Sequence, residues 1–284
     1  MNTGSGFSIQ IFLPSGEPEG LRIIEMPNWT GQGIVFPRSR LAEAHKREEL
    51  KRPGVYVLWG PGEDDELPRV YVGEGDTVLS RLDNHAKNKD FWTHAVAFTS
   101  KDKNFNKVHF KHLESRLVKL AREAKRAELK NDNKPQPPAV SEADSADAER
   151  FLANLLLCLP IVGIKMFEKV AVDQSKDDLL LRIKGKGIEA RGLDTAQGFV
   201  VQAGSQTVKQ EVPSIHPYLH TRRKLLIDLG VLEDAGGFYR FKQDYLFDSP
   251  SMAAGVILGR SSNGRDEWKD ADGHTLKELQ ELAV

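Results

Sequence analysis

The chain has 284 residues, a formal net charge of −1, 39% hydrophobic residues and 29% charged residues. This is the composition of an ordinary globular protein; the length suggests two domains, and the near-neutral charge limits nucleic-acid binding to a local patch. The single cysteine, Cys158, excludes an intrachain disulfide framework and a multi-cysteine zinc site.

Strand-like and helix-like segments alternate in the first hundred residues. Apolar and polar residues alternate at 7–13, and with 21–25 across a Pro/Gly-rich turn they predict a β-hairpin. Further along, two β-rich runs flank a Gly/Pro/Asp/Glu-rich loop, which is typical of an antiparallel pair. We expect the hairpin, a helix at 39–50, paired strands at 54–59 and 69–73, a helix at 77–88 and a strand at 93–99.

Two longer helices are predicted next, with a loop between them. Apolar residues recur at helical spacing from Lys107 to Leu129. The prolines of 131–140 cannot continue that helix, and Ser141 with Asp144 predicts a capping box for a helix that runs to Leu159. Beyond it we expect strands at 179–183, 198–202 and 238–241, and helices at 222–229, near Ser251 and near Leu276.

No targeting or membrane segment is predicted. The N-terminus lacks a basic start followed by an apolar run, so no signal peptide is expected. The longest apolar stretch, 152–164, is too short to span a bilayer and contains Pro160. We therefore expect a cytoplasmic protein with no membrane partner.

Five separated motifs form the most informative pattern in the sequence. Two of these motifs are tripeptides, and each tripeptide is a weak signal alone, because valine and tyrosine are ordinary strand formers. The ordered set resembles the GIY-YIG nuclease family, and the resemblance covers about a third of the chain, residues 52–135. It consists of Gly54-Val55-Tyr56, Tyr71-Val72-Gly73, Arg81, His85 and Glu114.

The resemblance implies a catalytic role for each of these side chains. Glu114 would be the only protein ligand of one Mg²⁺ or Mn²⁺, and Arg81 would hold the scissile phosphate. Tyr71 would activate water, with Tyr56 beside it. Because an unperturbed tyrosine has a pKa of about 10, it would need the metal and the arginine to become more acidic, or would relay its proton. His85 would accept that proton or contact phosphate.

Substrate contacts are less sharply assigned by the resemblance. An asparagine usually follows the glutamate helix in this family, and both Asn131 and Asn133 lie in the appropriate loop. Some branches carry lysine directly after the second tripeptide, where this chain has Glu74. That phosphate contact is then absent or comes from elsewhere, with Lys87 and Lys111 as candidates.

Structural roles compete with each of these functional ones. Glu114 borders an apolar helix stripe, and a salt bridge to Lys111 or Arg116 would explain it without catalysis. The histidines at 94, 109 and 112 form no convincing ligand cluster. Residues 101–130 contain ten Lys/Arg against four Asp/Glu, which indicates either a solvated helix face or a phosphate-binding strip.

The C-terminal section resembles an uncharacterised domain that accompanies many GIY-YIG proteins and restriction or modification enzymes. Its first matching residues predict a helix start, Asn263-Gly264 a tight turn, and Trp268 a core position. The matching positions are Ser249, Pro250, Ser251, Ala253, Ala254, Gly259, Asn263, Gly264, Trp268 and Gly273.

Two roles for this section are equally supported by the sequence. It could target the nuclease to DNA through Arg222, Arg223 and Lys224, or it could be a packing or dimerisation module. From Ser261 onward there are six acidic residues against three basic ones, which argues against direct contact between that last segment and a nucleic-acid backbone.

We expect an α/β (α+β) protein with a small antiparallel sheet and packed helices, followed by a smaller C-terminal α+β domain. The predicted divisions are an N-terminal extension at 1–50, the nuclease domain at 51–140, connecting elements at 141–197 and an accessory domain at 198–284. The main boundary is expected between Lys169 and Gly198.

The function expected from the resemblance is metal-dependent hydrolysis of DNA, in phage defence, restriction or repair. One metal site cuts one strand, so a duplex break would need a homodimer or two successive nicks. The first alternative is a catalytically inactive protein that binds DNA or recognises its modification, and a targeting partner could be required. The second is an interaction scaffold without affinity for nucleic acid.

Overall fold

The computed structural model describes residues 6–63, 67–168 and 180–282. The described residues fall into two compact units, 6–63 with 67–168 and 180–282, each with its own core. The fold class is mixed α and β, as expected. No helix in these ranges has the length and apolar run needed to cross a membrane.

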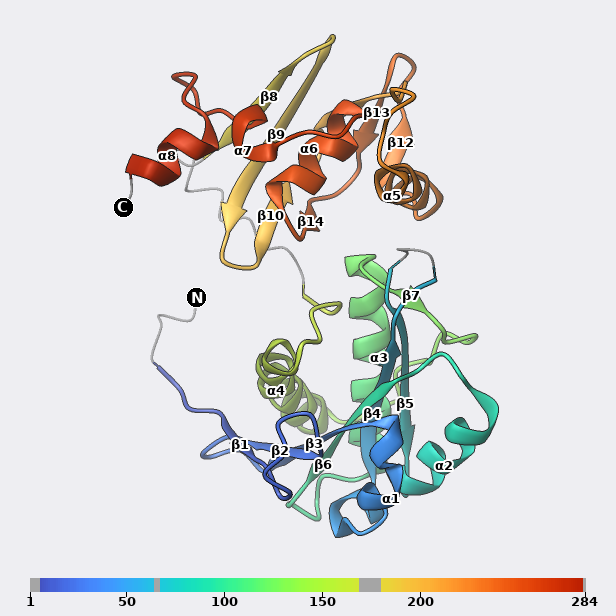
Figure 1. Ribbon diagram of the computed structural model, residues 1–284. Coiled ribbons are helices and arrows are strands. Elements are labelled where there is room, and N and C mark those ends of the chain that lie inside the picture. The colour runs from blue at the N-terminus through green and yellow to red at the C-terminus, as the bar shows by residue number, and fades with distance from the viewer. Residues whose placement is uncertain (1–5, 64–66, 169–179, 283–284) are drawn as a thin grey trace. The chain divides into compact units, whose positions relative to one another are not determined.

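A seven-stranded sheet organises the first unit (Figure 1). All neighbouring strands are antiparallel except β5 and β7, which are parallel. In spatial order the strands are β1 (Gln10–Phe12), β2 (Arg22–Glu25), β3 (Gly31–Pro37), β6 (His94–Ser100), β4 (Gly54–Gly60), β5 (Arg69–Gly75) and β7 (Glu128–Leu129).

Helices cover both faces of this sheet. On one face, α3 (Lys107–Ala124) and α4 (Glu142–Cys158) share a core with valines of β4, β5 and β6. On the other face, α1 (Leu41–Ala44) and α2 (Val78–Asn88) share a core that includes Tyr56. Side chains alternate along a strand. The two tyrosines of the motif therefore lie on the α2 face, while the valines on either side of each tyrosine face α3.

Several sequence predictions for this unit are confirmed. The hairpin of β1 and β2, the antiparallel β4–β5 pair and the loop before α4 are all present. Ser141 caps α4 by accepting a hydrogen bond from the backbone of Asp144 at 3.1 Å.

Other predictions were wrong in extent. The helix expected at 39–50 is divided into 3-10 turns at Arg38–Arg40 and Glu48–Lys51 around α1, because this polar stretch buries only Ala44 and Leu50. The helix expected to reach Leu129 ends at Ala124, where Lys125 takes a left-handed conformation with φ of 52°. The residues after it form β7 instead.

The second unit combines two small sheets with four helices (Figure 1). One sheet has the order β14 (Tyr245–Phe247), β10 (Gly198–Val201), β9 (Ile188–Thr195) and β8 (Leu181–Gly185). The other has the order β11 (Gln206–Val208), β13 (Phe238–Phe241) and β12 (Leu232–Asp234). The helices are α5 (Pro217–Asp228), α6 (Pro250–Leu258), α7 (Gly264–Glu267) and α8 (Leu276–Leu282).

The matching positions of the C-terminal section are mostly structural. Ser249 caps α6, and Trp268 is fully buried, both as expected. The predicted tight turn at Asn263-Gly264 is instead the start of α7, where the Asn263 side chain accepts from the backbone of Arg265. A Cβ on Gly264 would lie 2.2 Å from the Pro250 backbone, so glycine permits this close approach.

The predicted connecting segment, 141–197, is divided between the units. The helix α4 belongs to the first unit, whereas β8 and β9 belong to the second. At the other end of the chain, the predicted extension at 1–50 supplies three strands to the first sheet. Residue 179, at the start of one predicted strand, lies outside the described residues.

Candidate functional site

The two motif tyrosines lie on adjacent strands and meet His85 of α2. The ring centroids of Tyr56 and Tyr71 are 6.3 Å apart, and that of Tyr71 is 4.8 Å from that of His85. The Tyr56 hydroxyl and Nε2 of His85 are hydrogen-bonded at 2.8 Å. The resemblance therefore selects three side chains that the fold brings together.

Glycines of the second tripeptide region make this contact sterically feasible. Gly73 lies opposite Tyr56 in the strand pair, and a Cβ there would lie 2.3 Å from the Tyr56 hydroxyl oxygen. A Cβ on Gly75 would lie 2.8 Å from Cγ of Arg81. The first glycine gives room to a buried phenol, and the second lets the arginine cross the end of β5.

Arg81 lies on α2 and is exposed, and its side chain extends over the backbone at the end of β5. Its Nε donates to the carbonyl oxygen of Glu74 at 3.4 Å. The guanidinium acts to lower the pKa of both motif tyrosines, so its charge reaches them. A second cation, Lys89, lies 4.8 Å from the centroid of the Tyr71 ring, a contact that no motif in the sequence indicates.

Glu114 has the most informative electrostatic environment of these side chains. Burial, together with the negative charge of Glu74, raises the pKa of its carboxyl to about 7. Arg81, Lys111 and the backbone N–H of Glu74 oppose that rise. Among the described residues, Oε2 of Glu74 is buried and has no hydrogen-bond partner. Two carboxylates therefore meet here with less compensation than buried charges usually have.

The ionisation of the other site residues follows from burial. Burial is also the main cause that raises the pKa of Tyr56 and of Tyr71 above the usual value, and Glu114 adds to it. Burial and the charges of Lys89 and Arg81 lower the pKa of His85 to about 4. The imidazole is thus neutral near pH 7 and can accept a proton, whereas neither phenol ionises readily in the metal-free protein.

Asn131 is the asparagine that the fold brings to the site. Its side-chain oxygen accepts from the backbone N–H of Val72 at 3.0 Å, and its amide nitrogen donates to the Val72 carbonyl oxygen at 2.7 Å. Asn131 therefore extends the pairing along this edge of β5 beyond the end of β7. Asn133 is exposed, and its backbone carbonyl oxygen accepts a hydrogen bond from Arg122 at 3.4 Å. The geometry thus gives Asn131 a positioning role.

The remaining predicted candidates are more weakly connected to this cluster. Lys111 is exposed on α3 and reaches Glu114 only through its charge. Lys87 is exposed on α2 and forms no ion pair within the described ranges. The alternative that Arg116 neutralises Glu114 is wrong, because Arg116 pairs with Glu149 at 2.6 Å.

The helix histidines have structural partners. His109 lies 3.4 Å from Asp144 and completes the capping box of α3, while His112 lies 2.7 Å from Glu149. Both link α3 to α4.

Residues 181–280 match the family model of a domain of unknown function, DUF4357. This DUF4357 region is about a third of the chain and corresponds to most of the second unit. Neither a curated protein nor a solved structure matches the chain.

The predicted DNA contact at Arg223 of the DUF4357 region is wrong. The arginine is 2% exposed, and its guanidinium is used inside the unit. It donates to Glu211 at 2.8 Å, to Thr207 at 2.9 Å and to backbone carbonyls of β11 and α6. Sequence spacing could not reveal this, because these partners come from separate elements. Arg222 and Lys224 remain on the outer part of α5.

Ligand atoms of Asp270, Asp272 and His274 lie within 4.8 Å of one another in the same region. Asp270 already accepts from the backbones of Asp272 and His274 at 3.0 and 2.8 Å, and from the His274 ring at 3.1 Å. These bonds account for the clustering as a local turn.

Proposed function

We propose that the first unit is a metal-dependent endonuclease of the GIY-YIG type that hydrolyses phosphodiester bonds in DNA. The observation that carries this proposal is the elevated pKa of Glu114, about 7, beside an unpartnered carboxylate oxygen of Glu74. A divalent cation would compensate both negative charges. The tyrosines of β4 and β5 and Arg81 of α2, which the resemblance assigns to phosphodiester cleavage, interact electrostatically with Glu114 or with one another.

The two carboxylates fit a Mg²⁺ or Mn²⁺ ion. These ions prefer oxygen ligands, and Mg²⁺ commonly takes one or two carboxylates together with water and substrate phosphate. Glu114 would be the main ligand, and Glu74 would add a second oxygen. When bound, the ion would polarise the phosphate and stabilise the leaving oxygen. The position at which some family branches carry lysine would thus contribute to the cation site.

The other side chains supply phosphate binding and proton handling. Arg81 is exposed, forms no ion pair with a described residue, and has donors free to hold a phosphate oxygen. Tyr71 packs against His85 and feels the charge of this guanidinium, and its hydroxyl would orient the attacking water. The neutral His85 ring holds the Tyr56 hydroxyl at 2.8 Å, so this pair can take up a proton from the reaction.

Nicking of supercoiled plasmid in Mg²⁺ tests this function. We expect the wild type to cleave, and Glu114→Ala to lose on the order of 100-fold or more in rate, because charge stabilisation in the transition state is removed. Tyr71→Phe should be similarly impaired. Glu142→Ala, an exposed carboxylate on α4, is the matched control and should retain full activity.

Equal cleavage by the wild type and Glu114→Ala would rule out this assignment. Binding to plasmid without cleavage in either Mg²⁺ or Mn²⁺ would favour the alternative, a protein that binds DNA and has no nuclease activity. No binding and no cleavage would favour the interaction scaffold.

A further inference from the structure

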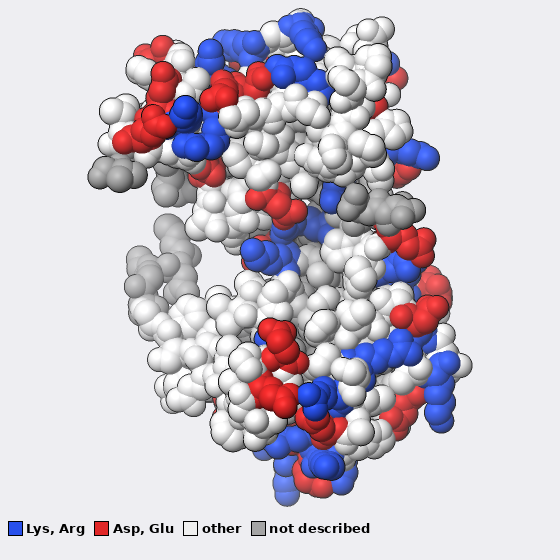
Figure 2. All heavy atoms as spheres, in the orientation of Figure 1, with Lys and Arg blue, Asp and Glu red and all other residues white. Residues whose placement is uncertain are grey.

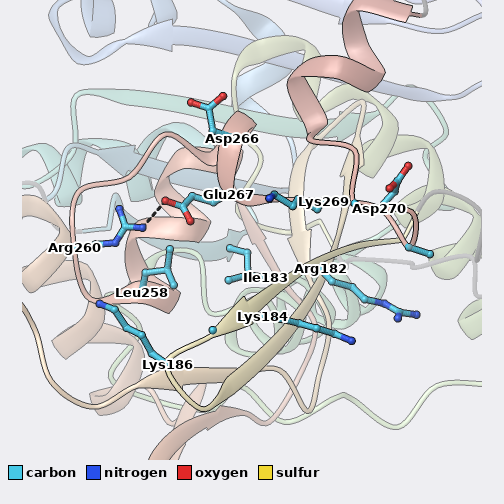
Figure 3. Close-up of a pocket in the computed structure, with 13 residues that line it drawn as sticks. Arg182, Ile183, Lys184, Lys186, Leu258, Arg260, Asp266, Glu267, Lys269 and Asp270 are labelled. Atoms are coloured by element: carbon cyan, nitrogen blue, oxygen red, sulfur yellow. Dashed lines mark hydrogen bonds and ion pairs between the residues drawn. The ribbon is translucent and has the colours of Figure 1, made fainter.

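A polar pocket lies in the second unit. Its residues are far in sequence from the two tyrosines and belong to the unit with the other core. It has a volume of about 460 Å³. Its walls come from β8 and the β8–β9 turn on one side and from residues 258–273 on the other (Figure 3). The segment after α7 is anchored to β8 by backbone bonds between Arg182 and Lys269 at 2.7 and 3.0 Å.

Three cations from one short segment border this pocket. Leu181 and Ile183 of β8 are buried in the core, so alternation directs the intervening side chains outward. Figure 3 shows Arg182 and Lys184 extending in the same direction from the strand. Lys186 occupies the two-residue turn that follows, with φ of 51°.

These cations lack the partners that would explain them as ordinary surface pairs. None of Arg182, Lys184 and Lys186 forms an ion pair with another described residue. Nε of Arg182 is buried, and no described residue forms a hydrogen bond with it. An unsatisfied buried donor is costly unless a ligand completes it.

The nearby carboxylates are largely engaged with other groups. Glu267 pairs with Arg260 at 2.5 Å, and Glu189 on β9 lies 3.5 Å from Arg191. Asp266 accepts from the Asn263 side chain at 2.6 Å, and Asp270 closes its own turn. The pocket is lined by five Lys or Arg side chains against three Asp or Glu side chains, so its formal charge is positive. In Figure 2, Lys and Arg side chains gather over the area where Figure 1 has the β8–β9 hairpin.

We propose that this pocket of the DUF4357 region binds the phosphate backbone of a nucleic acid. Alternate residues along a strand are about 6.6 Å apart, so Arg182 and Lys184 can contact successive groups of a repeating polyanion. Cations of this kind neutralise phosphates without identifying bases, so binding is independent of sequence and weakens with salt. That the polyanion is a nucleic acid rests on the proposed nuclease function.

Fluorescence anisotropy with a labelled 20-base-pair duplex tests this site in the full-length protein. EDTA is present throughout, so that no metal-dependent cleavage occurs. The test variant carries Lys184→Glu with Lys186→Glu. The control carries Lys242→Glu with Lys277→Glu, which makes the same change of charge at exposed positions after β13 and in α8. Circular dichroism melting confirms that both variants fold.

We expect the Lys184/Lys186 variant to bind at least about tenfold more weakly at 50 mM salt, and the slope of log K against log salt to fall by about 2. The control should match the wild type. A single Arg182→Gln substitution should reduce the slope by about 1.

An unchanged affinity and slope in the Lys184/Lys186 variant would overturn the proposal. So would a larger loss in the control variant, which would assign binding to the surface around Lys242 and Lys277. Displacement of the duplex by micromolar ADP would assign the pocket to a small phosphate ligand and would also overturn it. Because the assay requires no cleavage, a protein that binds through Lys184 and Lys186 yet cuts no DNA would refute only the nuclease function.

Discussion

Gly73 connects the sequence motif to the geometry of the site. Its missing side chain leaves room for the Tyr56 hydroxyl, since a Cβ would come within 2.3 Å of that oxygen. In Gly73→Ala we expect the phenol to move and its hydrogen bond to His85 to break. A displacement of about 1 Å at a reacting group can cost about 100-fold in rate.

Plasmid nicking by Gly73→Ala should therefore fall by about 10- to 100-fold. Gly237→Ala is the control, because a Cβ there would meet nothing within 4 Å. Full nicking by Gly73→Ala would show that the Tyr56–His85 contact is not needed for the reaction.

Glu74 should influence both metal affinity and its dependence on pH. The deprotonated form of Glu114 binds a cation, and its pKa is raised to about 7 by burial and by Glu74. Affinity for Mn²⁺ should thus rise as the pH approaches 7 and level off above it. Glu74→Gln removes a ligand oxygen and also lowers the pKa of Glu114, so affinity should weaken while levelling off at a lower pH.

Mn²⁺ titration followed by electron paramagnetic resonance measures both effects without DNA. We expect a loss of about 10- to 100-fold in affinity at pH 8, the size usual for supporting ligands. Glu142→Gln should behave as the wild type. The same affinity and the same pH midpoint in Glu74→Gln would contradict this role.

The sequence was most informative about residues whose spacing is fixed by local structure. Both tyrosines and Arg81 were selected by the resemblance to the GIY-YIG family, whose motifs here fall on two strands and a helix that local patterns predict. The position of Lys89 over Tyr71 and the orphan oxygen of Glu74 could not be predicted, since both depend on how distant elements pack. For the same reason, Arg223 looked like an exposed cation although it is buried.

Among the elements, α5 is fixed to its neighbours by Arg223. The guanidinium bonds to Glu211, Thr207 and carbonyls of β11 and α6. Arg223→Met would leave Glu211 and those carbonyls without their donor. Breaking a buried ion pair costs about 3–5 kcal/mol, and urea denaturation should show a loss of this size.

Lys224→Met is the control for that substitution on the same helix. Its side chain is exposed, so stability should change by no more than about 0.5 kcal/mol. If Arg223→Met were equally harmless, the buried network would not be holding α5 in place.

Elements with strong local patterns were the ones that could be predicted. The strand β4 is buried through almost all its length and carries the continuous apolar run of a central strand. The strand β3 was missed, because two of its seven residues are glycines and it ends at a proline. Trp29 lies against Gly31, and Phe98 against Gly33, so packing compensates for the missing side chains.

At the scale of the whole molecule, the two units should unfold separately because their cores share no residue. Calorimetry should resolve two transitions. Arg223→Met should lower only the transition of the second unit. Leu113→Ala, at a fully buried position of α3, should lower only that of the first, by an amount that reflects about 2–5 kcal/mol of lost packing.

A single transition that both variants shift equally would contradict this independence. The sequence indicated two domains from chain length, with a boundary expected between Lys169 and Gly198; the described residues of the first unit end at 168 and those of the second begin at 180. It could not assign α4 to the first unit, because that depends on contacts with α3 and β3 rather than on any break in composition.

The hydrogen bonds of Asn131 have a consequence beyond the site that they border. A strand edge with free backbone groups is a template on which another chain can add a strand, which leads to aggregation. The amide occupies both backbone groups of Val72, and β7 covers the residues before it. Replacing Asn131 would expose this edge to other molecules. The resulting insoluble protein could then be mistaken for a loss of catalysis.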